Sequence, residues 1–362
     1  MSGAPLSVVI AGGGTGGHLF PGIALAETLA SRGARVTFVG TASGIETRAV
    51  PAAGYPLRLV PGAQVRGGGV ARAARGLATT ARGVQTGVAL LGELRPDLVV
   101  GVGGYASVAL VLAAALRRTP ILLLEQNTIP GVASRALGRL ARRVCLGFAE
   151  AARFFPAGRS IHTGNPLRAA VLATPPRSHP TPGLLVIGGS QGAHRLNERT
   201  VEAFALLGAR AKGLRVLHQT GAADRDRIAA EYARLGVAAR VEAFVADMGG
   251  AYADADLVLA RAGAMSCAEI TARGLPALLV PFPYAVDDHQ RHNADVLVRA
   301  GAAEMVLERD LTAARLAAAL ARLVGEPATR MRMASASRAI GRPDAASRVA
   351  DACEDVVRRV SP

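Results

Sequence analysis

The two halves of this 362-residue chain open with the same short pattern, and this repetition limits the fold more than any other feature. Near the N-terminus, the apolar run Val8–Ala11 leads into the glycine-rich stretch Gly12–Gly17. Far downstream, Leu184–Ile187 leads into Gly188–Ala193. A short apolar run followed by glycines is typical of a buried strand whose turn opens a helix. The chain is therefore expected to contain two similar α/β domains.

Strand-like runs alternate with amphipathic stretches rich in Ala, Leu and Arg along both halves, which predicts βαβ units around parallel sheets. The expected strands are Leu6–Ala11, Arg35–Val39, Leu98–Val102, Pro120–Leu124, Arg143–Leu146, Gly183–Ile187, Val216–Gln219, Arg240–Phe244, Leu257–Ala260 and Ala277–Pro281. The proline-rich stretch from Pro166 to Pro182 is typical of a linker. We predict two facing Rossmann-like domains, residues 1–167 and 168–342, with a deep cleft between them. A C-terminal helix within 343–362 is expected to pack back on the first domain.

Composition narrows the classes of function. The formal charge is +15, and arginine supplies nearly all of the basic residues because Lys212 is the only lysine. Such a surplus indicates an anionic partner, which can be nucleic acid, anionic lipid or a phosphorylated small molecule. With 4% aromatic residues and no tryptophan, a base-stacking surface is not expected. Cys145, Cys267 and Cys353 form no CxxC pair, so neither a zinc site nor a disulfide framework is predicted. The longest apolar run, Val108–Leu116, is too short to cross a bilayer.

The first glycine-rich stretch has the spacing Gly12-x-Gly14-x-x-Gly17, which fits a dinucleotide-binding fingerprint. Exposed amides at a helix start also suit a phosphate. The fingerprint requires an acidic residue at the end of the second strand, but that strand ends at Val39–Thr41 without one. The next acid, Glu46, lies too far along the chain. A nicotinamide-dependent dehydrogenase thus loses support, and a turn that needs glycine only for packing stays open.

His18 stands where the glycine-rich loop meets the helix. Histidine titrates near neutral pH and suits a general base, while a helix-capping or phosphate-contacting role stays open. Two more polar segments, Gly101–Ser107 and Glu125–Asn127, follow predicted strands. Ligands bind at the carboxyl ends of parallel strands, so we expect these segments at one edge of the sheet. There the side-chain amides of Gln126 and Asn127 can bond sugar hydroxyls.

In the second half, Arg261–Glu269 follows a strand and opens a helix. Backbone groups at that helix start can contact a pyrophosphate or a uracil, and Glu269 can accept from both hydroxyls of a ribose. Asp254-Ala255-Asp256 has the spelling of a metal-binding motif, but it precedes the strand Leu257–Ala260. It therefore lies at the opposite end of the sheet, and no metal is expected there.

Seven motifs, taken together, resemble those of the MurG family of glycosyltransferases over about Ser7 to Ala350. They are GGGTGGHLFPG at Gly12–Gly22, GVGGYAS at Gly101–Ser107, EQN at Glu125–Asn127, TGNPLR at Thr163–Arg168, GGSQGA at Gly188–Ala193, RAGAMSCAE at Arg261–Glu269 and HQRHNA at His289–Ala294. The resemblance implies the GT-B arrangement of two Rossmann-like domains, with no cofactor and no metal. It also implies an inverting transfer of N-acetylglucosamine from its UDP donor to the C4 hydroxyl of membrane-anchored lipid I, giving lipid II.

The resemblance implies roles for individual residues as well. His18 would be the base or an acceptor-binding group. The residues implied to hold substrate are Thr15, Gly16 and Gly17 at the donor phosphates or sugar, Asn127 and Gln290 at the sugar, Arg168 and Ser190 at the pyrophosphate, Val245, Ala264 and Met265 at the uracil, and Glu269 at the ribose.

The implied partners are UDP-N-acetylglucosamine, lipid I (undecaprenyl-pyrophosphoryl-MurNAc-pentapeptide), an anionic membrane surface and other cell-wall synthesis or division proteins, with no nucleic acid. The implied place is the cytoplasmic face of the cell membrane, as a peripheral protein. We expect Val65–Leu91 to meet the membrane, because arginines there alternate with apolar residues. These residues are Arg66, Arg72, Arg75 and Arg82 with Val70, Leu77, Val84, Val88 and Leu90. An ordinary amphipathic helix whose apolar face belongs to the core stays open.

Three other functions fit part of the pattern. A UDP-sugar 2-epimerase would share the fold and the donor but needs no lipid-facing surface. A dehydrogenase would need the missing ribose-binding acid. A basic nucleic-acid-binding module would have no reason to place polar loops at so many strand ends.

Overall fold

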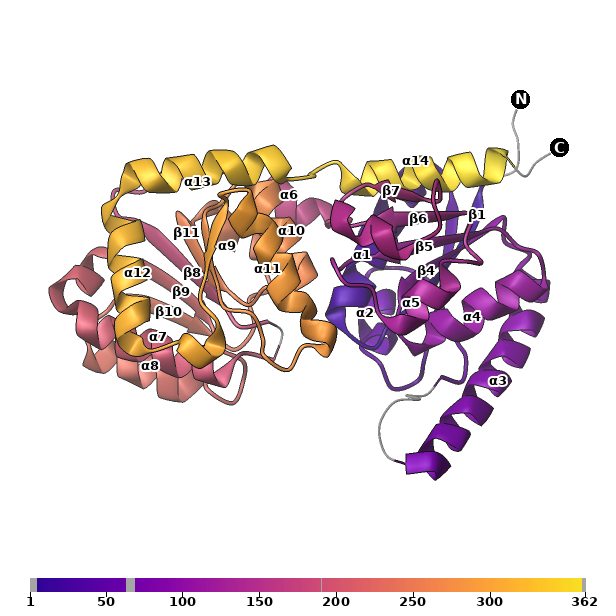
Figure 1. Ribbon diagram of the computed structural model, residues 1–362, viewed down its shortest axis with the longest axis horizontal. Coiled ribbons are helices and arrows are strands. Elements are labelled where there is room, and N and C mark those ends of the chain that lie inside the picture. The colour runs from indigo at the N-terminus through magenta and orange to yellow at the C-terminus, as the bar shows by residue number, and fades with distance from the viewer. Residues whose placement is uncertain (1–4, 63–68, 190, 360–362) are drawn as a thin grey trace. The chain divides into compact units, whose positions relative to one another are not determined.

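The computed structural model describes residues 5–62, 69–189 and 191–359, with the side chains of 69–74 and 212 left out. The chain divides into two compact units (Figure 1). Unit 1 comprises Met1–Arg168 and Asp344–Pro362, and unit 2 comprises Ala169–Pro343.

Unit 1 is built on a parallel sheet, which has seven strands in the described residues, in the order β3-β2-β1-β4-β5-β6-β7. The strands are β1 (Ser7–Gly12), β2 (Arg35–Gly40), β3 (Leu57–Leu59), β4 (Leu98–Gly103), β5 (Ile121–Glu125), β6 (Arg143–Leu146) and β7 (Ser160–His162). The helices are α1 (Gly16–Ser31), α2 (Glu46–Ala52), α3 (Gly69–Leu94), α4 (Tyr105–Leu116), α5 (Val132–Leu137), η1 (Ala149–Phe154) and α14 (Ala345–Arg358).

The side chains of β1 alternate between two hydrophobic cores, one on each face of this sheet. Val8 and Ile10 pack on one face with residues of α1 and α14. Val9 and Ala11 pack on the other face with residues of α3 and α4. On the first face, Arg32, the residue directly after α1, donates to acidic side chains of α14, at 2.7 Å to Asp351 and 3.0 Å to Glu354. The C-terminal helix α14 thus completes the core of the N-terminal unit.

Unit 2 repeats this architecture with a parallel sheet of six strands in the described chain, in the order β10-β9-β8-β11-β12-β13. The strands are β8 (Gly183–Ile187), β9 (Arg215–Gln219), β10 (Ala239–Glu242), β11 (Leu257–Ala260), β12 (Ala277–Leu279) and β13 (Ala303–Met305). The helices are α6 (Ala169–Ala173), α7 (His194–Leu207), η2 (Gly208–Gly213), α8 (Arg225–Arg234), α9 (Met248–Ala253), α10 (Ala264–Arg273), η3 (Val286–Asp288), α11 (His289–Arg299), η4 (Glu308–Asp310), α12 (Ala313–Gly325) and α13 (Pro327–Ile340).

The predicted pair of Rossmann-like, parallel-sheet domains is confirmed. Three short strands were not predicted, namely β3, β7 and β13, and each lies at an edge of its sheet. Edge strands of three residues carry too short an apolar run to stand out in a sequence. The prediction of a plain linker from Pro166 to Pro182 is wrong in part, because α6 lies within it. This helix packs so closely on α9 that a Cβ at Gly249 would lie 2.3 Å from the Ala170 carbonyl oxygen.

The helix α3 falls in the segment expected to meet a membrane, and its apolar residues divide into two groups. Val84, Val88 and Leu90 pack in the core of unit 1 beside α4 (Figure 1). Leu90 is buried, so the expectation that its side chain enters lipid is wrong, while Val84 and Val88 are partly buried against the same core. Leu77, by contrast, is 62% exposed and follows the exposed Arg75. Val65 and Arg66 lie outside the described residues, as do the side chains of Val70 and Arg72.

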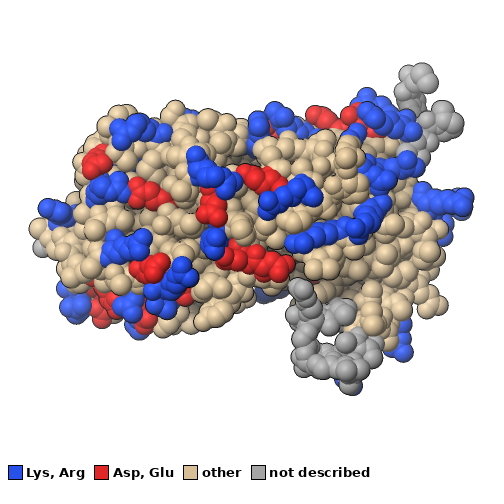
Figure 2. Space-filling view, viewed as in Figure 1, with Lys and Arg blue, Asp and Glu red and all other residues tan. Residues whose placement is uncertain are grey.

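On the face shown in Figure 2, charged residues are spread out rather than gathered in one block. Figure 2 shows arginines distributed across both units on the face in view, with acidic side chains among them. Many pairs are one turn apart on a helix, such as Arg234 with Glu231 and Arg348 with Asp344. Within the described residues, no helix is long and apolar enough to cross a membrane.

Candidate functional site

Both glycine-rich loops follow the strand at which the order of the sheet reverses. In unit 1, β1 pairs with β2 on one side and β4 on the other. In unit 2, β8 pairs with β9 and β11 in the same way. Open α/β sheets bind ligands at this switch point, outside the carboxyl ends of the strands. Each unit therefore offers one candidate ligand site.

In unit 1, the glycine-rich loop is held by a buried carboxylate that the sequence analysis had set aside. Glu46 Oε2 accepts a hydrogen bond from the Gly14 N–H at 2.8 Å. Its other oxygen, Oε1, accepts from both the N–H and the hydroxyl of Thr41, each at 2.9 Å. A Cβ at Gly13 would lie 2.3 Å from the Glu46 carboxyl carbon, so only glycine fits there. The loop is thus shaped around an anionic group of the protein itself.

Hydrogen bonds from its neighbours stabilise the negative charge of Glu46 in its buried position. Burial alone would raise the pKa of the Glu46 carboxyl, but the hydrogen bonds from Gly14 and Thr41 outweigh it and lower that pKa below its ordinary value. The glycine-rich loop therefore already has a permanent negative charge beside the Gly14 amide. Since this carboxylate is engaged by the loop, it is not placed as the ribose-binding acid of a dehydrogenase.

His18 lies in the first turn of α1, two residues after the helix begins at Gly16. Its Nδ1 is 3.2 Å from Gln126 Oε1, at the end of β5. Gln126 Nε2 in turn donates to the Val102 carbonyl of β4 at 3.0 Å. The structure therefore joins His18 to the segment after β5, as expected, but through Gln126. The side-chain amide of Gln126 is bonded within the protein, where the sequence analysis had assigned it to sugar hydroxyls.

The neighbouring residues of this segment are also held from within. Glu125 Oε1 accepts from the Asn127 N–H at 3.0 Å, and the Asn127 side chain also bonds the Glu125 carboxyl. Burial raises the pKa of the Glu125 carboxyl above its ordinary value. Arg168, expected at a pyrophosphate, places its guanidinium 4.9 Å from the ring centre of Phe20 in α1. Asn127 and Arg168 thus belong to the same unit as His18 and the loop residues Thr15, Gly16 and Gly17.

In unit 2, Glu269 is positioned by a tyrosine that the sequence analysis did not identify. Glu269, on α10, accepts a hydrogen bond at Oε2 from the Tyr252 hydroxyl at 2.9 Å. Tyr252, on α9, is almost fully buried, and burial raises its pKa well above the ordinary value. The tyrosine therefore stays protonated and donates to the carboxylate. A carboxyl group held in this way has the lone pairs that bonding of ribose hydroxyls requires.

The other residues predicted in unit 2 also lie beyond the carboxyl ends of its strands. Ala264 and Met265 form the first turn of α10, directly after β11. Val245 is buried after β10, and Gln290 lies in the first turn of α11. Gln290 Oε1 accepts from the Phe282 N–H at 3.0 Å, which ties α11 to the loop after β12. The structure thus brings these residues to one edge of the sheet of unit 2.

The second glycine-rich loop is anchored to β9 by a buried polar network. Gln219 Nε2 donates to the Gly189 carbonyl at 2.8 Å. Beside it, Asn197 Nδ2 donates to the Thr220 carbonyl at 2.9 Å and to Asp224 at 2.8 Å. The Asn197 amide oxygen is 3.1 Å from Nε2 of the buried His218. Ser190, the predicted residue of this loop, lies outside the described residues.

Two groups of this network have strongly shifted pKa values. Burial lowers the pKa of His218 to about 3, so its ring is neutral at physiological pH. Burial would raise the pKa of Asp224, but hydrogen bonds from Arg227, Asn197 and His194 lower it to about 2. The network therefore combines a neutral imidazole with a permanent carboxylate at the start of α7 and α8.

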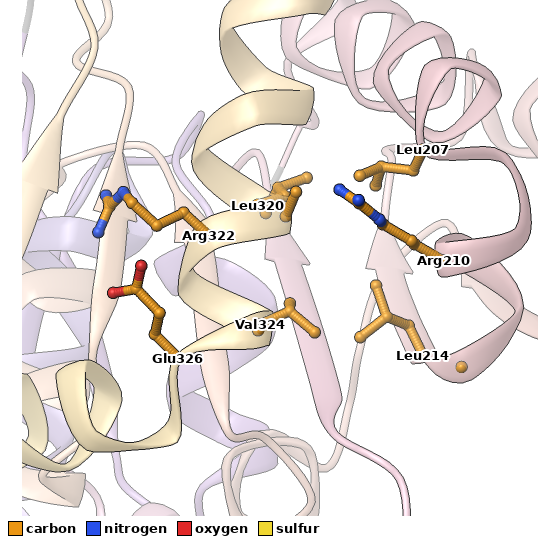
Figure 3. Close-up of a pocket in the computed structure, with 10 residues that line it drawn as sticks. Leu207, Arg210, Leu214, Leu320, Arg322, Val324 and Glu326 are labelled. Carbon is orange, nitrogen blue, oxygen red and sulfur yellow. The ribbon is translucent and has the colours of Figure 1, made fainter.

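A pocket of about 540 Å³ lies elsewhere in unit 2, between α12 and the end of α7 with η2 (Figure 3). Leu207, Leu214 and Leu320 line it, and Arg210 extends into it between them (Figure 3). None of the predicted substrate residues line this pocket. It is therefore not the site that the motifs predict.

The motif Asp254-Ala255-Asp256 has structural partners at the amino end of β11, as its position predicted. Asp254 pairs with His179 at 2.9 Å and Arg177 at 3.2 Å. Asp256 accepts from the Gly183 N–H at 2.8 Å. Among the described residues, no group of three or more His, Cys, Asp or Glu side chains is arranged to hold a metal ion.

Comparisons with known proteins cover both units. The family model for the glycosyltransferase family 28 N-terminal domain matches residues 8–146, and that for the C-terminal domain matches residues 183–352.

A relative from Pelobacter propionicus is 47% identical over 96% of this chain and 98% of its own length. Its name is UDP-N-acetylglucosamine–N-acetylmuramyl-(pentapeptide) pyrophosphoryl-undecaprenol N-acetylglucosamine transferase. A relative of the same name from Anaeromyxobacter is also 47% identical, over 98% of this chain and 94% of its own. The crystal structure of Acinetobacter baumannii MurG matches with a TM-score of 0.80 and 30% identity, over 97% of this chain and all of that one.

The chain belongs to the MurG family of glycosyltransferases. The predicted family and enzyme class are confirmed. A putative UDP-N-acetylglucosamine 2-epimerase from Listeria monocytogenes has the same fold, with a TM-score of 0.71 but 15% identity. That likeness concerns the fold alone, so sequence identity and not architecture separates the family from the epimerase alternative.

The family motifs contain the expected site residues, but not all of the residues that hold them in place. Glu269 and His18 were predicted from their motifs, whereas Tyr252 and the structural roles of Gln126 and Glu46 were not. Glu46 follows a glycine-containing turn and is the first acid after β2, which was the available signal. Tyr252 had none, because its partner lies 17 residues away on another helix.

Proposed function

We propose that this enzyme transfers N-acetylglucosamine from UDP-N-acetylglucosamine to lipid I, in the synthesis of peptidoglycan. The observation that carries the proposal is the match of both units, at 44–47% identity and nearly full length, to relatives named for that reaction. The positions of the polar groups in the two units support it.

The donor nucleotide is proposed to bind unit 2. Glu269, held by Tyr252, would accept hydrogen bonds from the ribose hydroxyls. The backbone of Ala264 and Met265, with Val245, would frame the uracil, and the first turn of α10 directs N–H groups outward beside it. Ser190 and Arg168 stay our candidates for the pyrophosphate, and Gln290 and Asn127 for the sugar. The Gln290 amide oxygen is engaged by Phe282, so its NH₂ group is the part suited to a sugar hydroxyl oxygen.

His18 is proposed as the base of an inverting displacement. The C4 hydroxyl oxygen of the acceptor's N-acetylmuramic acid attacks the anomeric carbon, and the bond from that carbon to the UDP oxygen breaks. The hydroxyl proton passes to the His18 ring as the new bond forms. The negative charge that develops on the UDP is stabilised by helix N-terminal amides and Arg168. Thr15, Gly16 and Gly17 are proposed to line the space beside His18.

A peripheral location at the cytoplasmic face of the cell membrane is part of the proposal, because lipid I is anchored there. The first half of α3 is the proposed contact. Arg75 and Leu77 are exposed on it, and the core-facing Val84 and Val88 keep the second half on the body of unit 1. Anionic headgroups attract arginines, and an exposed leucine can enter the lipid boundary. Other cell-wall synthesis or division proteins are further proposed partners.

One incubation tests the proposed reaction. The enzyme is mixed with UDP-N-acetylglucosamine, with and without a lipid I analogue in detergent, and the products are separated. We expect UDP and a disaccharide-bearing lipid, both dependent on the acceptor. Formation of UDP-N-acetylmannosamine without acceptor would instead support the 2-epimerase alternative. No consumption of donor in either mixture would contradict the proposal.

A further inference from the structure

The side-chain amide of Gln126 lies between a backbone carbonyl and the His18 ring. Gln126 Nε2 is 3.0 Å from the Val102 carbonyl oxygen, and Gln126 Oε1 is 3.2 Å from His18 Nδ1. A carbonyl oxygen can only accept a hydrogen bond, so the NH₂ group of the amide must face Val102. Turning the amide over would set two oxygen atoms against each other. The amide oxygen therefore faces His18.

This orientation decides which nitrogen of His18 carries the proton. An amide oxygen can only accept, so Nδ1 of His18 must be the donor in the 3.2 Å contact. In a neutral imidazole, one nitrogen is protonated and the other has the lone pair. With the proton on Nδ1, the lone pair belongs to Nε2, the nitrogen that faces away from Gln126.

Gln126 itself is fixed on several sides. It is 3% exposed, and its own backbone carbonyl accepts from Asn165 Nδ2 at 3.0 Å. The histidine ring is also close to β4, since a Cβ at Gly103 would lie 2.5 Å from His18 Nδ1. The ring is thus packed against the backbone of Gly103, while the amide of Gln126 is held by β4. This environment leaves little freedom for the ring to turn over.

We propose that Gln126 is a positioning residue, which holds His18 in the Nδ1–H tautomer so that Nε2 can take the proton from the acceptor hydroxyl. This inference rests on the proposed function, in which His18 is the base. Gln126 touches neither substrate nor the reacting atoms in this account. It acts only through the protonation state and orientation of the His18 ring.

The tautomer can be measured directly in the full-length protein, without substrate. Two-bond ¹H–¹⁵N correlation spectra of ¹⁵N-labelled protein distinguish Nδ1–H from Nε2–H imidazoles, and the His18→Ala variant assigns the His18 signals. We expect the Nδ1–H pattern in the parent. Gln126→Leu, which can neither accept nor donate, should shift His18 toward the Nε2–H form. Gln126→Glu should retain the proton on Nδ1, because a carboxyl group that donates its own proton to the Val102 carbonyl still offers Nδ1–H an acceptor oxygen.

A matched control comes from unit 2. Gln219 is also 3% exposed at the end of a strand, and its amide donates to a backbone carbonyl. Gln219→Leu should leave the His18 signals unchanged. An Nε2–H pattern in the parent, or an Nδ1–H pattern that survives in folded Gln126→Leu, would overturn the proposal. If Gln126→Leu does not fold, loss of the Nδ1–H pattern in Gln126→Glu would overturn it.

Turnover provides the second readout. Gln126→Leu should lower kcat by ~10²-fold, in the range of a general-base contribution, with the Kd for UDP unchanged. Gln126→Glu should recover most of this loss. Equal kcat in the parent and Gln126→Leu would overturn the positioning role. A protein that shows the expected tautomers but no transfer to lipid I would contradict the proposed function instead, so the two failures are distinguishable.

Discussion

At the scale of single residues, the first glycine-rich loop departs most from its expected role. Its spacing indicated a turn that offers amides to a ligand phosphate. In the structure, the Gly14 amide donates to the carboxylate of Glu46, 32 residues further along the chain. A second anion at the same amide would be repelled by that charge. The loop is therefore suited to present His18 and its neighbours at the start of α1, rather than to enclose a diphosphate at Gly14.

Glu46→Gln tests this role. Glutamine has one acceptor oxygen where three donors converge, and its NH₂ group would face one of them, so a buried donor is left without an acceptor. We expect a loss of ~1–3 kcal/mol in the free energy of unfolding at pH 7, measured by denaturant titration. The variant should also be less sensitive to acid than the parent. The pKa of Glu46 is lowered in the folded state, so its stabilisation is present above pH 4.5 and is lost as the pH falls below that value.

Glu27→Gln is the matched control, since Glu27 is exposed on α1. It should leave the stability within ~0.5 kcal/mol of the parent. If Glu46→Gln is as stable as this control at pH 7, Glu46 does not hold the loop.

The carboxylate of Glu269 is the residue-scale determinant of nucleotide binding in our account. Glu269→Ala should weaken UDP binding by ~1.5–3 kcal/mol, the worth of a charge-assisted hydrogen bond, which is roughly tenfold or more in Kd. Tyr252→Phe keeps the buried ring but removes the donor to Glu269, so a smaller weakening is expected. Isothermal titration with UDP measures both. Glu231→Ala, which removes an exposed partner of Arg234, should bind UDP as the parent does, and an equally unaffected Glu269→Ala would remove Glu269 from the ribose.

At the scale of elements, the network that joins α7, β9 and α8 predicts how unit 2 responds to acid. His218 is buried as a neutral ring, and its pKa falls from 6.5 to about 3 on folding. A lowered folded-state pKa means that the stabilisation is complete above pH 6.5 and is lost as the pH falls toward 3. Lowering the pH from 7 to 5 should therefore reduce the free energy of unfolding by about 2 kcal/mol through His218 alone. The stabilisation from the Asp224 carboxylate is lost at lower pH, as the pH falls from 3.8 toward about 2.

The His218→Gln variant separates these contributions. The His218 ring contacts Asn197 at Nε2 and the Tyr232 hydroxyl at Nδ1, each at 3.1 Å. Glutamine can bond the same two groups but does not titrate, so the variant should lose less stability than the parent between pH 7 and pH 5. Denaturant midpoints at the two pH values check this. His292→Gln, at a partly exposed histidine of α11, should behave as the parent does. The same acid sensitivity in His218→Gln and the parent would mean that His218 is not the group that titrates on unfolding.

The helix α3 carries the element-scale prediction for the membrane. Replacing Arg72, Arg75 and Arg82 with glutamine should abolish co-sedimentation with anionic vesicles at low salt and leave UDP binding unchanged. Each basic residue near the surface contributes ~1 kcal/mol, so three account for most of the electrostatic attraction. Glutamine at Arg225, Arg234 and Arg240, three exposed arginines of unit 2, removes the same charge elsewhere. Equal sedimentation of the two triple variants would show that α3 is not the membrane face.

At the scale of the whole molecule, the sequence predicted the centre of each sheet better than its edges. Val8–Ala11 and Leu184–Ile187 are continuous apolar runs because parallel strands are covered on both faces. The edge strand β13 is only Ala303–Met305, and its pairing with β12 depends on the sheet already being in place. Family motifs predicted which residues gather at the strand ends.

The sequence did not predict how those residues are held. His18 and Gln126 are 108 residues apart, and no local pattern links a histidine on a helix to an amide after a distant strand. The same is true of Glu46 and the glycine-rich loop. Such contacts follow from the order of the strands, in which β2 and β4 flank β1 and β5 lies beyond β4. Glu46 of α2, which follows β2, reaches Gly14, and Gln126, which follows β5, reaches His18 in α1. A single sequence predicts the motifs more readily than the distant residues that hold those motifs in place.

We propose that unit 2 binds the uracil and ribose of the donor and that unit 1 supplies the base. His18→Ala tests it most directly, with kcat measured from UDP release in the presence of a lipid I analogue and the Kd for UDP measured by titration. The account predicts that kcat falls by ~10²–10⁴-fold while the Kd for UDP stays within a few-fold of the parent, because a base acts in the transition state. An unchanged kcat with a weakened Kd for UDP would contradict it, and would assign His18 to the donor's phosphates.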